Sequence, residues 1–231
     1  MPTEEIIFKH PPATEVQLAV TFPNNLAVAD QRSKFHDRVR AGFPTVIIPE
    51  QNKLAYDFGD YTLQKQDMSE RLEIGMNYFR LVSSRYLGFA KFRAVFLDAL
   101  DAFSECYDVK SYAGLLMSYR NVLPLEGKLQ FEKVFTLNIS LPQSLETELF
   151  AGQGLLAFQK PQGNVIIQLE PKVEGSQVTA YFMNLLFNTS PDKPHFDKAL
   201  VSDLAGTAHD YLRRFFFGVL QPPYLEYLAK R

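Results

Sequence analysis

Two one-sided apolar rows, each long enough for a helix of several turns, limit the architecture of this chain more than any other stretch of it. Apolar residues recur in both rows at intervals of three or four, which is the spacing of one face of an α-helix. The first row is Phe89, Phe92, Phe96, Ala99, Leu100, Phe103 and Cys106, and the second is Phe196, Leu200, Leu204, Ala208, Leu212 and Phe216. We therefore predict helices at about 88–107 and 194–219. Each has one face to bury, so both are expected to cover a sheet.

Alternating apolar and polar residues indicate the strands of that sheet. Val16, Leu18 and Val20 share one face of a strand at 14–22, and the longest such pattern in the first half spans 71–84 as a single strand. Further strands are predicted at 45–48, 112–123, 131–141, 155–159, 164–173 and 177–188. The last three are separated by Pro161-Gln162-Gly163 and Glu174-Gly175-Ser176, which favour tight turns and hence a meander. A first helix is expected at about 25–41, before the helix stop formed by Gly42 and Pro44.

These elements predict an α+β fold, with an antiparallel or mixed β-sheet covered by three main helices. We expect residues 1–231 to form a single compact unit. A long aromatic strand pattern precedes a long helix in each half of the chain, with Tyr78-Phe79 in the first and Tyr181-Phe182 in the second. A construction from two structurally similar halves, at about 1–125 and 126–231, therefore stays open.

Composition excludes several classes of protein. Lys and Arg number 24 against 26 Asp and Glu, so the chain has no global field of the kind that drives sequence-independent nucleic-acid binding. Cys106 is the single cysteine, which excludes an intramolecular disulfide and thiolate-rich metal sites. The first residues resemble no signal peptide, and no window approaches the length of a membrane span. We expect a cytoplasmic protein with no membrane contact and no cofactor.

Motifs with chemical potential are incomplete in this sequence. Gly152-Gln153-Gly154 has the letters of a dinucleotide-binding turn, but a strand pattern follows where that motif requires a helix. His209-Asp210 resembles a ligand pair of metal-dependent phosphohydrolases, which need further convergent ligands. The plain alternative for His209 is a hydrogen-bonded residue within a helix. Cys106 lies on an apolar helix row, so we expect a core cysteine and no nucleophile.

Basic and aromatic residues mark two candidate binding regions. Around the strand at 71–84 and the helix after it, arginines alternate with rings that could stack on nucleic-acid bases, although nearby acids neutralise much of the charge. The tail after Pro222-Pro223 carries tyrosines that could dock a partner or fold back on the sheet. Together with the His-Asp pair, the candidate binding residues are Tyr78, Arg80, Arg85, Tyr86, Arg93, His209, Asp210, Tyr224 and Tyr227.

Several short segments resemble a family of conserved hypothetical bacterial proteins of similar length and sporadic distribution. They are Pro11-Pro12-Ala13-Thr14-Glu15-Val16-Gln17-Leu18-Ala19-Val20-Thr21-Phe22, Phe43-Pro44, Leu204-Ala205-Gly206-Thr207-Ala208-His209-Asp210 and Phe215-Phe216. The chain departs from the family pattern at 112–119, where a tyrosine followed closely by an asparagine is expected. The resemblance implies a mobile-element, defence or toxin–antitoxin neighbourhood. It transfers no activity and no catalytic residue, and Glu15 and His209, which recur in the family, fit a structural role equally well.

We therefore expect a non-catalytic interaction or ligand-binding protein, with a protein partner or a small ligand and an oligomeric state that the sequence does not set. The enzyme alternative is a phosphate-directed hydrolase using His209 and Asp210. The third alternative is a nucleic-acid-binding module.

Overall fold

The computed structural model describes residues 8–48, 60–125, 131–137, 153–175, 177–189 and 196–231. Within them, nine strands form one antiparallel sheet in the order β2-β3-β4-β5-β1-β6-β9-β8-β7, so the predicted α+β class is confirmed. The strands are β1 (Ala13–Thr21), β2 (Thr45–Ile47), β3 (Tyr61–Gln64), β4 (Glu70–Gly75), β5 (Tyr78–Ser83), β6 (Gly114–Pro124), β7 (Gly154–Lys160), β8 (Gly163–Glu174) and β9 (Gln177–Thr189). The helices are α1 (Leu26–Asp30), α2 (Arg32–Val39), α3 (Phe89–Tyr107), α4 (Phe131–Val134), α5 (Lys198–Val219) and α6 (Pro222–Lys230).

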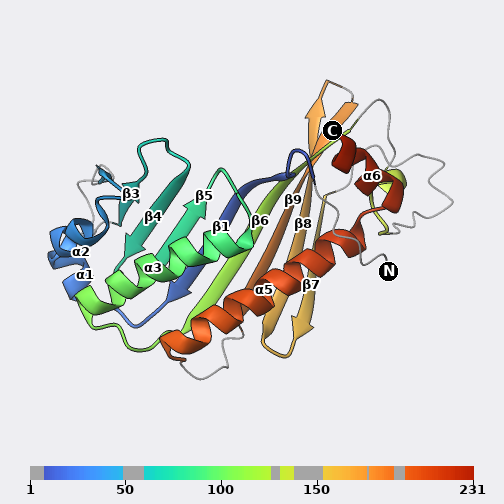
Figure 1. Cartoon of the computed structure of the whole chain (residues 1–231). Coiled ribbons are helices and arrows are strands. Elements are labelled where there is room, and N and C mark those ends of the chain that lie inside the picture. Colours follow the sequence, from blue (N-terminus) through green and yellow to red (C-terminus); the bar gives the residue numbers. More distant parts are fainter. Residues whose placement is uncertain (1–7, 49–59, 126–130, 138–152, 176, 190–195) are drawn as a thin grey trace.

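The strand order repeats about the centre of the sheet. Outward from β1 lie β5, β4 and β3, and outward from β6 lie β9, β8 and β7, while β1 and β6 pair with each other. Each set of strands is followed by one of the long helices, and α3 and α5 both lie across the same face of the sheet (Figure 1). The chain thus places one arrangement of strands and a helix twice, side by side, and within the described ranges no long helix lies on the other face of the sheet.

The core lies between these two helices and the sheet. In the first half, Phe79 of β5 meets Phe96 and Phe103 of α3 with ring centroids 5.7 and 4.9 Å apart. In the second half, α5 buries Ala208, Leu212 and Phe216 against β6 and β9. Most of the predicted helical rows are therefore core, as their spacing indicated.

The row predicted along the final helix is wrong at Leu200, and its first member, Phe196, is buried but precedes α5, where it pairs with Tyr112. Leu200 is 44% exposed, and the buried positions there are Val201 and Ala205. A strict four-residue spacing advances about 40° per step beyond a full helical turn. Over the four steps back from Phe216, the row has therefore turned away from the sheet.

Three further predictions need correction. The helix expected at 25–41 is two short helices, since Gln31 between them leaves the helical region with φ −116° and ψ 39°. The strand expected at 71–84 is the hairpin of β4 and β5, and its turn at Met76 and Asn77 offers both carbonyls to backbone N–H groups of Asn25 and Phe22. The strand expected from Phe131 begins as the single-turn helix α4, and 138–141 lie outside the described residues.

The meander is confirmed as β7, β8 and β9, with antiparallel pairing throughout. The tail forms α6, with Pro222 in its first turn, and buries Tyr224, Leu225 and Leu228. Among the described residues, no helix is long and apolar enough to cross a membrane.

Candidate functional site

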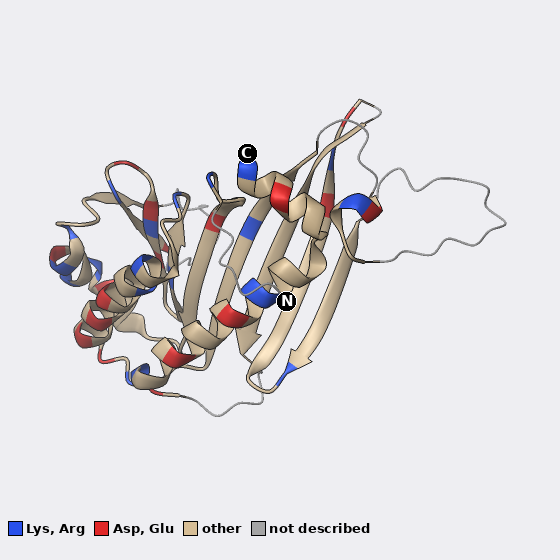
Figure 2. Cartoon of the chain, turned by 45° about the vertical axis from the view of Figure 1, so that its right-hand side comes forward, with Lys and Arg blue, Asp and Glu red and all other residues tan. Residues whose placement is uncertain are grey.

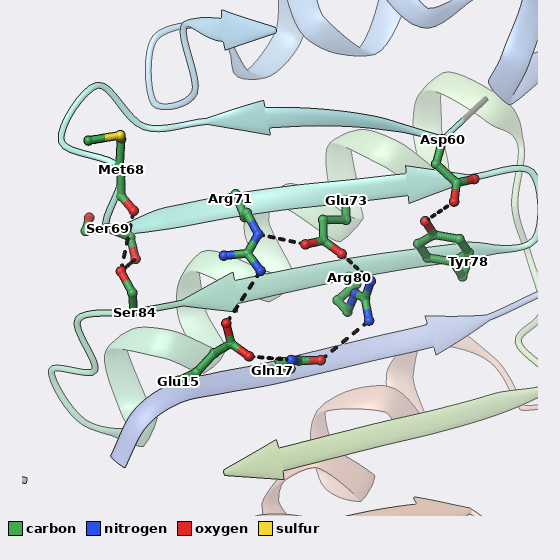
Figure 3. Close-up of polar contacts among 10 residues, drawn as sticks. All are labelled: Glu15, Gln17, Asp60, Met68, Ser69, Arg71, Glu73, Tyr78, Arg80 and Ser84. Atoms are coloured by element: carbon green, nitrogen blue, oxygen red, sulfur yellow. Dashed lines mark hydrogen bonds and ion pairs between the residues drawn. The ribbon is translucent and has the colours of Figure 1, made fainter. Parts of the chain in front are cut away.

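The structure divides the candidate residues among three places. Tyr86, Arg93 and His209 converge on the helix-covered face, near the start of α3 and the middle of α5. Tyr78 and Arg80 lie on the opposite face of the sheet (Figure 3). Tyr224 and Tyr227 belong to α6, and their rings lie at an angle of 36° with centroids 5.6 Å apart. Arg85 and Asp210 are exposed.

A pocket of about 560 Å³ opens where the first group converges. Its floor is the central sheet, its roof is one face of α5, and its sides are the segment before β1 and the loop between β5 and α3. This volume is in the range of pockets that take small molecules. The lining residues are Phe8, Lys9, Pro11, Pro12, Ala13, Tyr86, Leu87, Gly88, Tyr119, Asn121, Leu185, His209, Leu212, Arg213, Phe216 and Phe217.

His209 is held in place by a ring on one side and a hydroxyl on its edge. Phe89 stacks on the imidazole with centroids 4.1 Å apart and planes within 7°, and the Arg93 guanidinium lies 5.3 Å from the centre of the Phe89 ring. Nδ1 of His209 lies 2.8 Å from the Tyr119 hydroxyl, which lies 3.1 Å from the Tyr86 hydroxyl. Three side chains from α5, β6 and the loop before α3 thus form one hydrogen-bonded chain along the pocket wall.

The hydrogen-bonded side chains of Tyr86, Tyr119 and His209 are neutral at physiological pH. Burial lowers the pKa of His209 below its ordinary value, an effect that Asp210 opposes and that Arg213 and Arg93 reinforce. Burial also raises the pKa values of Tyr86 and Tyr119 above the ordinary range of a phenol. With the imidazole proton on Nε2, Tyr119 donates to His209 and Tyr86 donates to Tyr119. Nδ1 of His209 and the Tyr119 hydroxyl are thus both engaged within the pocket wall.

Asn121 supplies the polar group at the bottom of the pocket that sequence reasoning missed. Its side chain is only 3% exposed, and its Nδ2 donates to the carbonyls of Met183, at 3.1 Å, and Tyr119, at 3.4 Å. Because both partners are acceptors, the amide orientation is fixed, and Oδ1 accepts no hydrogen bond from any described residue. The signal was available: Asn121 occupies a core-facing place in the alternation of β6, between Tyr119 and Leu123.

The opposite face of the sheet carries a closed ring of polar contacts (Figure 3). Arg71 donates to Glu73 at 2.7 Å, Glu73 accepts from Arg80, and Arg80 reaches Gln17 at 3.5 Å. Gln17 donates to Glu15 at 2.8 Å, and Glu15 lies 3.5 Å from Arg71. The Arg80 guanidinium is therefore engaged within its own chain, which leaves less of it for a nucleic-acid phosphate.

The remaining candidates have ordinary local roles. Tyr78 donates to Asp60 at 2.6 Å, and buried Tyr224 donates to the Pro124 carbonyl at 2.8 Å. Tyr224 thus attaches α6 to the end of β6 and is not a free docking anchor. Cys106 is buried in the core as expected.

Charge and ligand groups give the two alternatives little support in the described part of the chain. Basic and acidic residues are interspersed over the helices in Figure 2, with no continuous basic stripe across the face it presents. No group of three or more His, Cys, Asp or Glu side chains that could hold a metal ion occurs within the described ranges. The hydrolase that would use His209 and Asp210 stays a prediction, and the described residues supply no further metal ligands beside that pair.

No protein-family model matches the chain, and no curated protein matches it either.

Proposed function

We propose that this chain is a non-catalytic binding protein for a small organic ligand, and that the pocket beneath α5 is its binding site. The observation that carries the proposal is the combination of an open apolar pocket of about 560 Å³ with a fixed set of polar groups on its inner wall. Small-molecule sites have this composition, because apolar walls supply affinity and a few fixed polar groups supply orientation.

The same geometry favours binding over catalysis. Nδ1 of His209 is engaged by the Tyr119 hydroxyl at 2.8 Å, and burial raises the pKa of Tyr86 and Tyr119, so neither phenol is an activated nucleophile. A general base or nucleophile needs an activated group within reach of a substrate. The hydrogen-bonded side chains of Tyr86, Tyr119 and His209 instead form a rigid, selective wall of the pocket.

A fluorescent displacement assay tests the proposal. The neutral dye N-phenyl-1-naphthylamine brightens in apolar surroundings, and we expect saturable binding to the full chain. Ala13→Phe places a ring in the pocket wall and should abolish that binding. The matched control is Ala94→Phe on the exposed side of α3, which should bind the dye as the wild type does.

Circular dichroism of both variants checks that the fold is kept. Equal dye binding by folded Ala13→Phe, or no saturable binding by the wild type, would contradict the proposal. Steady turnover of a hydrolase or nuclease substrate that disappears in His209→Ala would contradict its non-catalytic part.

A further inference from the structure

The two ends of the pocket carry different polar groups that lack a partner among the described residues. At the bottom, Oδ1 of the pocket-lining Asn121 is an acceptor with no donor among the described residues. At the rim, Lys9 and Arg213 have no ion pair with a described residue. Of the described residues that line the pocket, none is acidic.

Each end selects one property of a ligand. A ligand that displaces water from this acceptor without replacing the hydrogen bond leaves it unpaired, so the bottom favours a ligand that brings an O–H or N–H group. A rim with two cations and no carboxylate favours an anion and disfavours a second cation. The Arg213 guanidinium carbon lies over the Phe217 ring, 5.5 Å from its centre, and a guanidinium that contacts a ring in this way can still donate through its N–H groups to the paired oxygens of a carboxylate.

The wall between the two ends is apolar and partly aromatic. Leu185 rises from the sheet, while Leu212 and Phe216 descend from α5 and Phe8 packs edge-on against Phe216 at 6.0 Å. The middle of a ligand must therefore be an apolar body, and flat rings fit such walls well.

We propose that the pocket takes a hydroxylated organic acid, with its carboxylate at the Arg213 and Lys9 rim, an apolar or aromatic body, and its hydroxyl donating to Oδ1 of Asn121. This assignment rests on the proposed function, because it concerns the same pocket. The ligand class is defined by two groups at opposite ends of one molecule, a carboxylate and a hydroxyl.

Matched ligands separate the two contributions without altering the protein. The probes are 3-(4-hydroxyphenyl)propanoate, 3-phenylpropanoate, which lacks the hydroxyl, and 3-(4-hydroxyphenyl)propanamide, which lacks the charge. Each is compared with its homologues from the acetate to the pentanoate chain, in displacement of N-phenyl-1-naphthylamine from the full chain. The hydroxylated acid of the best-fitting length should displace the dye at an at least about tenfold lower concentration than either analogue, since each lost contact leaves the cations of the rim or the acceptor at the bottom unpaired in the complex.

Variants at the rim test the anion contact. Arg213→Gln should remove the preference for the acid over the amide and keep the preference for the hydroxyl. The control is Arg214→Gln, which changes an exposed neighbour on α5 that does not line the pocket and should keep both preferences.

The failures of the two proposals are distinct. If the dye binds saturably and is displaced equally by all three ligand types, or best by the amide or the unhydroxylated acid, the ligand class is wrong and the binding function stands. If the dye itself does not bind, the proposed function fails, and the ligand class fails with it.

Discussion

The hydroxyl of Tyr119 is the centre of the hydrogen-bonded chain in the pocket wall, so Tyr119→Phe is the most direct perturbation of it. The substitution keeps the ring, which is buried with only 9% exposed, and removes the two hydrogen bonds to His209 and Tyr86 at 2.8 and 3.1 Å. A net contribution of about 0.5–1.5 kcal/mol per hydrogen bond gives a loss of about 1–3 kcal/mol in the free energy of unfolding. Water can enter from the pocket and partly replace the lost partner, which places the expected loss at about 1–2 kcal/mol.

Urea unfolding followed by circular dichroism measures this loss as a lower midpoint with an unchanged slope. For a chain of this length the melting temperature should fall by roughly 2–8 °C. Tyr86→Phe is the matched control, because the Tyr86 hydroxyl is hydrogen-bonded to one of these side chains only, that of Tyr119. It should cost about half as much.

The reasoning is refuted if Tyr119→Phe is as stable as the wild type, or if Tyr86→Phe costs more than Tyr119→Phe. A double-mutant cycle of Tyr119→Phe with His209→Gln adds a second check. The two residues are in direct contact, so the cycle should give a coupling of at least about 0.5 kcal/mol.

Three other perturbations have outcomes that the structure fixes. Gly163→Ala would place a Cβ 2.1 Å from the Asn188 carbonyl oxygen and should cost about 1–3 kcal/mol or more in urea unfolding, whereas Gly154→Ala, with no atom within 4 Å, should change stability by less than about 0.5 kcal/mol. Removal of all residues after Gln221 deletes three buried side chains of α6 and should cost roughly 5–8 kcal/mol, so an unchanged unfolding midpoint would contradict the packing of the tail. The pKa of His209 is lowered in the folded chain, so the unfolded chain binds a proton first as the pH falls below 6.5. The free energy of unfolding of the wild type should therefore drop below that pH. Urea unfolding measured across this pH range should show a smaller drop for His209→Gln.

The periodic parts of the fold could be predicted from the sequence because they depend on local spacing. Helix α3 lies at the predicted position, and the three strands of the meander follow the predicted alternation and turn residues. The errors fall where a local pattern competes with a distant contact. Met76 and Asn77 continue an alternation, yet they turn the chain because their carbonyls bond to the residues that follow β1.

The candidate site was predicted only in part, for the same reason. Tyr86, Arg93 and His209 stood out by residue type. Tyr119, which joins Tyr86 and His209, and Asn121 at the bottom of the pocket lie in a strand that reads as ordinary core. Arg80 stood out equally and lies on the opposite face, where the register pairs it with Glu73 of β4 and its guanidinium reaches Gln17 of β1 at 3.5 Å.

By itself the sequence determined the α+β class and the two long helices, because periods of 3.6 and 2 are properties of neighbouring residues. It did not determine the core-facing side of β5, where Phe79 and Leu81 face the helices and Tyr78 does not. The tertiary structure alone decided that β1 and β6 meet at the centre of the sheet and that α5 crosses above β6. The hydrogen bonds that build the pocket wall join residues 33 and 90 positions apart. No local spacing encodes contacts of that separation, which exist only once the two halves of the chain share one sheet.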